Sequence, residues 1–268
     1  MNQYQIRQLL LKFLKCNNYK NIVDNGLYIF AEGELPICLL AHMDTVFAKP
    51  PTDIYFDQEQ HMMWSPQGLG ADDRAGIYAI IRLAKMGFRP SIIFTDLEEQ
   101  GGIGANWLAK DYPECPFKDC KALIQIDRRG SIDSVYYECA NKEFEEKINS
   151  YGFVTNLGSF TDISIIAPTW NIAAVNLSTG YYNEHSPIEH LNIEELETTI
   201  SKISFMLKHC SSWPKYDYVE AEDDGVWWTP DRCICCGKPL KENEHHVCPG
   251  YDSKYSFNVC DECYAAYF

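Results

Sequence analysis

Apolar residues recur at every third or fourth position in several stretches of the chain, and this spacing predicts amphipathic helices. In residues 4–15, for example, Ile6, Leu10 and Leu14 share one helical face. Further helices are expected from residue 72 to about residue 87, and over residues 103–110, 143–151 and 193–207.

Short apolar runs bounded by turn residues alternate with these helices and predict strands. They cover residues 27–31, 36–40, 91–95, 121–126, 134–138 and 171–177. The polar segment 50–67 is expected to be a loop or an exposed hairpin, and residues 181–187 a loop. Strands that alternate with helices in this way predict an α/β domain whose mixed, mostly parallel central sheet is flanked by helices.

Residues of the kinds that bind metals stand at or just beyond the ends of four predicted strands. They are His42, Glu98 with Glu99, Asp127, and His185. Open α/β sheets place their ligands at the carboxyl ends of their strands, so we expect these side chains to meet in a metal site. Each also has a simpler interpretation, as a polar residue at a strand end or on the surface that makes only local hydrogen bonds.

An acidic pair, Asp72-Asp73, joins a polar loop to the second predicted helix. The simpler interpretation is that Asp73 caps the helix and Asp72 is solvated. Considered together with the strand-end residues, Asp72 is instead the candidate for a carboxylate that bridges two metal ions. Thr161 or Asp162, in a turn before a helical stretch, is interpreted most simply as a helix cap.

Two short spacings suggest how the roles are divided at such a site. His42 and Asp44 are two residues apart, so in an extended chain they point to the same side and Asp44 can orient the imidazole. Glu98 and Glu99 precede Gly101-Gly102, where the backbone can approach a site closely. One of these glutamates is expected to bind metal and the other to handle a proton.

Composition limits the classes of protein to which the chain can belong. Its 268 residues suffice for one large domain and a small appendage. The net charge of −15 argues against nucleic acid as a partner. No apolar run approaches membrane-spanning length and the N-terminus does not read as a signal peptide, so we expect a cytoplasmic protein without membrane contact. In that compartment the twelve cysteines favour metal-bound thiolates over disulfides.

Six of the cysteines crowd into residues 233–263. The pairs Cys233-x2-Cys236 and Cys260-x2-Cys263 have the spacing of a structural zinc site. Alternative ligands in the same stretch are Cys235, His245, His246 and Cys248.

The crowding of cysteines in this last stretch of the chain also suggests the domain boundaries. We expect residues 1–210 to form the main domain, 211–231 an acidic linker with aromatic anchors, and 232–268 a zinc-binding module with four cysteine ligands. Residues 233–268 hold three lysines and five acidic residues, which argues against DNA binding. The module is expected to stabilise the chain or to dock a protein partner.

The order and spacing of the main-domain residues resemble those of the co-catalytic di-zinc exopeptidase clan, which includes the zinc aminopeptidases and peptidase T. The resemblance covers about residues 35–200. It rests on His42-x-Asp44, Gly70-Ala71-Asp72-Asp73-Arg74, Glu98-Glu99, Asp127 and His185-Ser186-Pro187.

The resemblance implies a role for each of these residues. One catalytic zinc ion would be held by His42, Asp72 and Asp127, and the other by Asp72, Glu99 and His185. Glu98 would be the general base, and Asp44 would orient His42. Tyr181 or Tyr182 would either stabilise the oxyanion or simply pack. With the cysteine site added, the expected cofactors are two catalytic zinc ions and one structural zinc ion.

The implied reaction is hydrolysis of a peptide or related amide, and an aminopeptidase acting on short peptides is the favoured form. The alternatives are an N-acyl amino-acid deacylase and a non-catalytic adaptor that keeps the fold. In the families that the chain resembles, aspartate at the position of Asp127 accompanies aminopeptidases, whereas glutamate accompanies carboxypeptidases and desuccinylases. Larger clan members insert a lid domain before the last histidine; only 57 residues separate Asp127 from His185 here, so we expect no lid.

Overall fold

The computed structural model describes residues 1–221, 233, 240, 246–249, 256–261 and 263–264. It divides into two compact units. The first comprises Met1–Asn156 and Thr161–Glu220, and the second comprises Leu157–Phe160 and Ala221–Phe268. Among the described residues, no helix combines the length and the apolar character needed to cross a bilayer.

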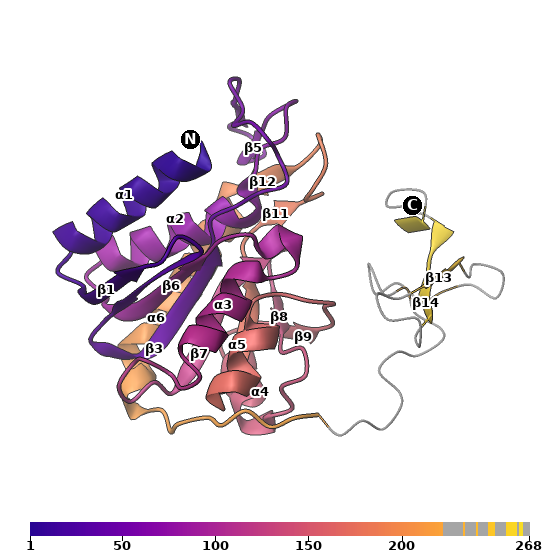
Figure 1. Ribbon diagram of the computed structural model, residues 1–268. Helices are drawn as coiled ribbons and strands as arrows, with labels where there is room; N and C mark the ends of the chain where they lie inside the picture. The colour runs from indigo at the N-terminus through magenta and orange to yellow at the C-terminus, as the bar shows by residue number, and fades with distance from the viewer. Residues whose placement is uncertain (222–232, 234–239, 241–245, 250–255, 262, 265–268) are drawn as a thin grey trace. The chain divides into compact units, whose positions relative to one another are not determined.

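An eight-stranded sheet forms the centre of the first unit (Figure 1). Its strand order is β1-β2-β6-β3-β7-β10-β8-β9. The strands are β1 (Lys20–Asp24), β2 (Tyr28–Glu32), β3 (Leu35–His42), β6 (Pro90–Thr95), β7 (Ala122–Arg128), β8 (Asp133–Val135), β9 (Val154–Asn156) and β10 (Ala174–Ser178). The run β6-β3-β7-β10 is parallel, whereas β1, β2 and β8 each pair antiparallel with a neighbour. The predicted mixed, mostly parallel sheet is therefore confirmed.

Helices cover both faces of this sheet (Figure 1). They are α1 (Gln3–Cys16), α2 (Ala71–Lys85), α3 (Ile103–Asp111), α4 (Lys142–Asn149), α5 (Ile163–Trp170) and α6 (Ile193–His209), with short 3₁₀ turns η1 (Glu98–Gln100) and η2 (Cys210–Ser212). The predicted helices over residues 4–15, 103–110, 143–151 and 193–207 are confirmed within a few residues at each end.

The two faces of β3 show why this strand is apolar at nearly every position. Ile37 and Leu39 pack into the core formed with α1, α2, α4 and α6. Cys38 and Leu40 point the opposite way, into the core formed with α3 and α5. Successive side chains of a strand alternate between faces, so a strand covered on both sides must be apolar throughout.

A second, four-stranded sheet has the order β11-β12-β5-β4. Its strands are β4 (Tyr55–Asp57), β5 (Met62–Trp64), β11 (Tyr181–Tyr182) and β12 (His190–Asn192). The exposed hairpin expected within residues 50–67 is thus present as β4 and β5. The prediction of a loop over residues 181–187 was wrong at its first two residues, because they pair with β12.

The structure differs from the predicted elements at two other places. The strand β1 was not predicted, because at the edge of the sheet its residues are mostly exposed and its sequence carries no apolar alternation. The expected strand over residues 134–138 is shorter and ends at Val135. Beyond α6, Trp213 and Tyr216 are buried in the core of the first unit, which extends to Glu220.

Candidate active site

The side chains expected at strand ends come together at the carboxyl edge of the parallel strands. His42 is the last residue of β3, and Asp127 lies one residue before the end of the neighbouring β7. Glu99 follows β6 on the turn η1, and His185 lies in the connection between β11 and β12. Asp72 lies at the start of α2. Residues more than 140 positions apart in the chain thus share one site because parallel neighbours end at one edge.

Asp72 is the centre of this cluster. Its Oδ1 lies 3.0 Å from Nε2 of His42, and its Oδ2 lies 3.1 Å from Nε2 of His185. Asp72 and His42 are buried, whereas the side chain of His185 is 43% exposed. The predicted solvated state of Asp72 in the simpler interpretation is therefore wrong, and the cluster is open to solvent on the side of His185.

Two further carboxylates complete two groups around Asp72. Oδ1 of Asp127 lies 3.4 Å from Nε2 of His42, and Oε2 of Glu99 lies 2.9 Å from Nε2 of His185. The Nε2 atom of each imidazole therefore faces Asp72 and one other carboxylate. These two groups have the same membership as the two sets of zinc ligands that the resemblance implied.

The donor set fits divalent zinc. Ligand atoms of His42, Asp72 and Glu99 all lie within 4.8 Å of one another. Oε1 of Glu99 is buried and has no hydrogen-bond partner among the described residues. Imidazole nitrogens and carboxylate oxygens around an unsatisfied buried oxygen are the chemistry that Zn²⁺ accepts. The assignment of individual ligands stays a prediction.

Asp44 holds both the imidazole and the turn that follows β6. Its Oδ1 lies 3.3 Å from Nδ1 of His42. The two carboxylate oxygens accept hydrogen bonds from the backbone N–H groups of Glu98 and Glu99, at 3.1 and 3.2 Å. Asp44 therefore faces the imidazole of His42, as their two-residue spacing suggested, and it also holds the backbone of both glutamates. Its role in orienting His42 stays a prediction.

The carboxylate of Asp127 is held by three neighbours. Its Oδ2 accepts hydrogen bonds from Nε2 of Gln125 at 2.9 Å and from Oγ1 of Thr161 at 3.1 Å. The hydroxyl of Tyr181 is 3.3 Å from Oδ1. Tyr181 is buried with its hydroxyl beside the carboxylate of Asp127. The hydroxyl of Tyr182 donates to Glu195 at 2.7 Å. Both tyrosines thus have partners within the fold, and their oxyanion role stays untested.

The prediction that Thr161 or Asp162 caps a helix was wrong. The hydroxyl of Thr161 donates to Asp127, and Asp162 makes no side-chain cap hydrogen bond at the start of α5. The buried carboxylate of Asp162 instead accepts a hydrogen bond from the hydroxyl of Thr95. Both residues therefore belong to the surroundings of the cluster, a contact that local spacing could not reveal.

Asp72 and Asp73 lie at the start of α2, where the backbone departs from helical geometry. The peptide bond between the two residues is cis, and neither has helical backbone angles. Oδ1 of Asp73 accepts a hydrogen bond from the backbone N–H of Gly76 at 2.9 Å, which is capping geometry, and Oδ2 accepts one from the N–H of His42 at 3.2 Å. The capping interpretation of Asp73 is thus confirmed, and its second oxygen also ties α2 to the end of β3.

Glu189 is a residue of the site that the sequence did not suggest. It is fully buried and accepts hydrogen bonds from the backbone N–H groups of Gly70 and Asp72, the latter at 3.1 Å. It lies four residues after His185, so it joins the segment that carries His185 to the loop that carries Asp72. The available signal was an acidic residue directly before the short strand β12, and it becomes informative only once the two segments are known to meet.

The titration of the cluster in the metal-free protein reflects the crowding of its charges. Burial would lower the pKa of His42, but Asp127, Asp44 and Asp72 outweigh it and raise that pKa well above the ordinary value. Hydrogen bonds to Asp72 and Glu99 raise the pKa of His185 to about 11. Both imidazoles are therefore protonated at neutral pH and supply the positive charge that holds the carboxylates together.

The pKa values of the carboxyl groups in the cluster shift in different directions. Burial would raise the pKa of Asp72, but its hydrogen bonds to His185 and His42 lower it instead. Burial and the charge of Asp72 raise the pKa of Asp127 to about 7, although His42 opposes the shift. Burial, with the charges of Asp127, Asp162 and Asp72, raises the pKa of Glu98 to about 9 against the opposing effect of His42. In the metal-free protein Glu98 therefore holds a proton at neutral pH, whereas Asp72 is ionised.

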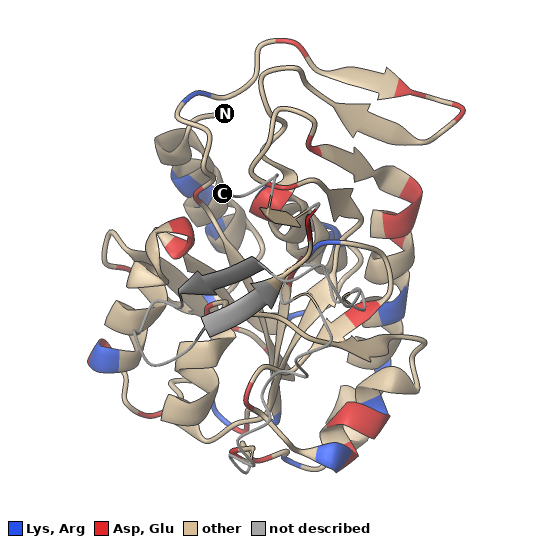
Figure 2. Cartoon of the chain, turned by 90° about the vertical axis from the view of Figure 1, so that its right-hand side faces the viewer, with Lys and Arg blue, Asp and Glu red and all other residues tan. Residues whose placement is uncertain are grey.

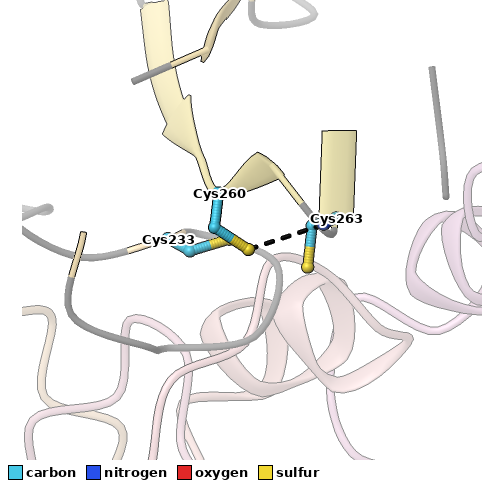
Figure 3. Close-up of side chains that lie close together, drawn as sticks. All are labelled: Cys233, Cys260 and Cys263. Atoms are coloured by element: carbon cyan, nitrogen blue, oxygen red, sulfur yellow. Dashed lines mark hydrogen bonds between the residues drawn. The ribbon is translucent and has the colours of Figure 1, made fainter. Parts of the chain in front are cut away.

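The second unit brings three of the four expected cysteine ligands together (Figure 3). Cys260 follows β14 (Ser256–Val259), which pairs antiparallel with β13 (His246–Pro249). The sulfur atoms of Cys233, Cys260 and Cys263 lie within 4.8 Å of one another, and all three residues are buried. The backbone N–H of Cys263 donates to Sγ of Cys260 at 3.5 Å. Cys236, Cys235 and His245 lie outside the described residues, as do the side chains of His246 and Cys248.

Charge is mixed over the described surface. Lysine and arginine positions are interspersed with acidic ones in the view of Figure 2, and do not gather into a stripe there.

Comparison with known proteins identifies the fold. Neither a family model nor a curated protein sequence matches the chain. Among solved structures, the aminopeptidase PepT of Bacillus cereus and a tripeptidase of Staphylococcus aureus each superpose with a TM-score of 0.63 at 14% identity, over 78% of this chain and 93% of theirs. A Zn-dependent exopeptidase of Parabacteroides distasonis gives a TM-score of 0.53 at 17% identity, over 76% of this chain and 89% of its own. The chain therefore has the fold of the co-catalytic zinc exopeptidases, as the resemblance predicted.

Proposed function

We propose that the protein is a zinc-dependent exopeptidase that removes the amino-terminal residue from short peptides. The observation that carries the proposal is the position of Asp72, whose two carboxylate oxygens lie 3.0 and 3.1 Å from Nε2 of two different histidines. A carboxylate shared between two His–carboxylate groups is suited to bridge two ions. His42, Asp72 and Asp127 would hold one, and Asp72, Glu99 and His185 the other.

Two bound zinc ions would polarise the substrate carbonyl and make a water molecule acidic enough to lose a proton near neutral pH. Glu98 would accept that proton and return it to the amine that leaves. It is half-buried, and its backbone N–H is held by Asp44. Asp44 would act through His42, because its carboxylate lies 3.3 Å from Nδ1 while Nε2 is directed at Asp72.

The preference for a free amine rests on charge and on Asp127. Three further acidic residues, Asp73, Glu98 and Glu184, are next to residues of the cluster in the sequence. In the structure Glu184 is paired with Arg129 at 3.0 Å, and burial raises the pKa of Asp73 well above its ordinary value. Neither Glu184 nor Asp73 therefore offers free negative charge to an ammonium group, so the preference rests mainly on Asp127. Aspartate at position 127 agrees with an aminopeptidase.

The 57 residues between Asp127 and His185 support a small-substrate site without a lid. They contain β8, α4, β9, α5 and β10, which belong to the central sheet and its helices. Within the described part of this interval, the loops at strand ends remain available as walls, and His185 lies on the exposed side. Short peptides should reach the cluster from that side.

The test is a substrate comparison with the zinc-loaded protein. A short unmodified peptide such as trialanine should lose its first residue, and the same peptide acetylated at its amine should not be cleaved. A Glu98→Gln variant measured in parallel should be slower by about 10²-fold or more, which excludes a contaminating peptidase. Preference for N-acylated amino acids would favour the deacylase, and removal of the last residue a carboxypeptidase. Two tightly bound zinc ions without any hydrolysis would favour the adaptor.

A further inference from the structure

A cavity of about 390 Å³ lies at the opposite edge of the central sheet from the candidate active site. Lys121 and Ile172 line it, and they come shortly before β7 and β10 in the chain. These strands are parallel, so their amino-terminal ends lie at the other edge from the metal cluster. The cavity is therefore separate from the site described above.

Two free cysteines, Cys115 and Cys120, line this cavity. Cys115 is half-buried, and its Sγ lies 3.7 Å from the carbonyl oxygen of Phe117. Cys120 is buried, and its Sγ lies 3.6 Å from the carbonyl oxygen of Ala122. Both therefore face one space from the two ends of a short connecting segment, and Cys115 is the more open to solvent.

The two thiols are not equivalent. Interaction with the Cys120 thiol lowers the pKa of Cys115, and the charge of Lys215 acts in the same direction while burial opposes it. The same interaction, with burial, raises the pKa of Cys120 well above its ordinary value. A thiol with more thiolate character beside a protonated, buried thiol is the arrangement of an attacking and a resolving cysteine.

The rest of the cavity wall indicates what could enter. Phe117 and Trp170 provide apolar surface, and Lys121 and Lys215 provide positive charge in a chain with a net charge of −15. Asp119 also lines the cavity and offsets part of that charge. A small anionic molecule with an apolar or sulfur-containing centre suits such a wall better than a cation does.

We propose that Cys115 and Cys120 form a redox-active dithiol that exchanges with small anionic disulfides such as oxidised glutathione. The Cys115 thiolate attacks one sulfur of the disulfide, a protein–glutathione bond forms, and one glutathione thiolate leaves and takes up a proton. Cys120 then gives up its proton and attacks Sγ of Cys115, which displaces the second glutathione. The two protein thiols are oxidised to a Cys115–Cys120 disulfide, and one glutathione disulfide is reduced to two thiols.

The chain offers contrasts that make the proposal specific. Cys16 is exposed but lies on α1 and outside this cavity, so it can form only a mixed disulfide. Cys38 is fully buried on β3. Cys16 is accessible but has no second thiol in this cavity, and Cys38 is inaccessible. Neither should therefore give the intramolecular disulfide that is expected of Cys115 and Cys120.

The experiment exposes the full-length, zinc-loaded protein to oxidised glutathione, blocks the remaining thiols and maps disulfides by mass spectrometry of an unreduced tryptic digest. Trypsin cleaves after Lys118, between the two cysteines, so a Cys115–Cys120 disulfide joins two peptides that reduction separates. Cys120→Ser should accumulate a stable glutathione adduct on Cys115. Cys115→Ser should lose the cross-link and leave Cys120 unmodified. Cys16→Ser is the matched control and should form the cross-link as the unmodified chain does.

The readout is independent of peptidase activity, so it stands or falls apart from the proposed function. Lys215→Gln should slow formation of the cross-link, because the charge that favours the Cys115 thiolate is removed. The proposal is overturned if Cys16 becomes glutathionylated while no Cys115–Cys120 cross-link forms. It is also overturned if Cys120→Ser fails to trap an adduct on Cys115 while its circular dichroism and metal content match those of the unmodified chain.

Discussion

The buried carboxylate of Glu189 accepts a hydrogen bond from the backbone N–H of Asp72 at 3.1 Å. Through this contact the segment that carries one candidate histidine ligand supports the backbone of the candidate bridging carboxylate. The two residues lie 117 positions apart in the chain. The cluster therefore depends on a residue outside the proposed set of ligands.

Replacing Glu189 by glutamine should weaken metal binding without removing a ligand. The amide can accept from only one of the two N–H groups and turns its own N–H₂ toward the other. We expect a loss of about 1–3 kcal/mol in unfolding free energy, and a loss of zinc affinity of about 10- to 100-fold. Denaturant unfolding and competitive zinc titration measure the two effects.

Glu197→Gln is the matched control for Glu189→Gln. Glu197 forms a surface ion pair with Arg82 at 3.4 Å, and its side chain is 40% exposed. Removing such a pair should cost less than about 1 kcal/mol and leave zinc affinity unchanged. Equal effects of the two substitutions would contradict the positioning role of Glu189.

Glu98→Gln and Glu99→Gln should separate proton transfer from metal binding. Glu98→Gln should retain both metals and lower kcat by about 10²-fold or more, the usual contribution of a general base. Glu99→Gln should reduce the zinc content by one ion, because its Oε2 faces Nε2 of His185. Metal analysis and kcat on the same preparations decide between the roles. Full activity of Glu98→Gln would mean that the two roles are assigned wrongly.

The metal-free protein should lose stability as pH rises from about 5 to about 9. The folded chain holds protons on Asp127, with a pKa of about 7, and on Glu98, with a pKa of about 9, whereas the unfolded chain releases them near the ordinary values of 3.8 and 4.5. His185, with a folded pKa of about 11, likewise keeps its proton above the ordinary histidine value of 6.5. For each group unfolding releases a proton, so higher pH favours unfolding.

Zinc binding should show the opposite dependence on pH. Zinc replaces the protons of the imidazoles, so its affinity should increase with pH and its binding should release protons. Thermal unfolding of chelator-treated and zinc-loaded protein, at about pH 5, 7 and 9, tests both statements. A melting temperature of the metal-free protein that rises over this range would contradict the protonated cluster.

Zinc at the three described cysteines should hold the second unit together. We predict about three zinc ions per chain in all, two at the cluster of Asp72 and one in the second unit. Cys233→Ser or Cys263→Ser should unfold the small unit and remove one ion, because a structural zinc supplies much of the folding free energy of a small module. Elemental analysis and limited proteolysis measure the loss. The second unit staying folded without zinc would refute the prediction.

The sequence allowed prediction of those site residues whose position follows from local pattern. His42 and Asp127 stand where an apolar strand ends, and parallel strands bring such ends together. Glu189 and Thr161 could not be predicted in the same way, because their partners lie 34 or more residues away and depend on how the segments meet in space. Asp162 was misjudged for the same reason. Its position before α5 fits a cap, whereas its carboxylate accepts a hydrogen bond from the hydroxyl of Thr95.

The strand order has a consequence for synthesis on the ribosome. Strand β10 lies between β7 and β8, although β8 and β9 precede it in the chain. The edge of β7 that pairs with β10 in the folded protein therefore stays unpaired until the ribosome has made residue 178. During that interval the nascent chain carries an apolar strand with one open side, the kind of surface that other chains can pair with. His42, Asp72, Glu99 and Asp127 are all translated before this gap is filled, and His185 only after it.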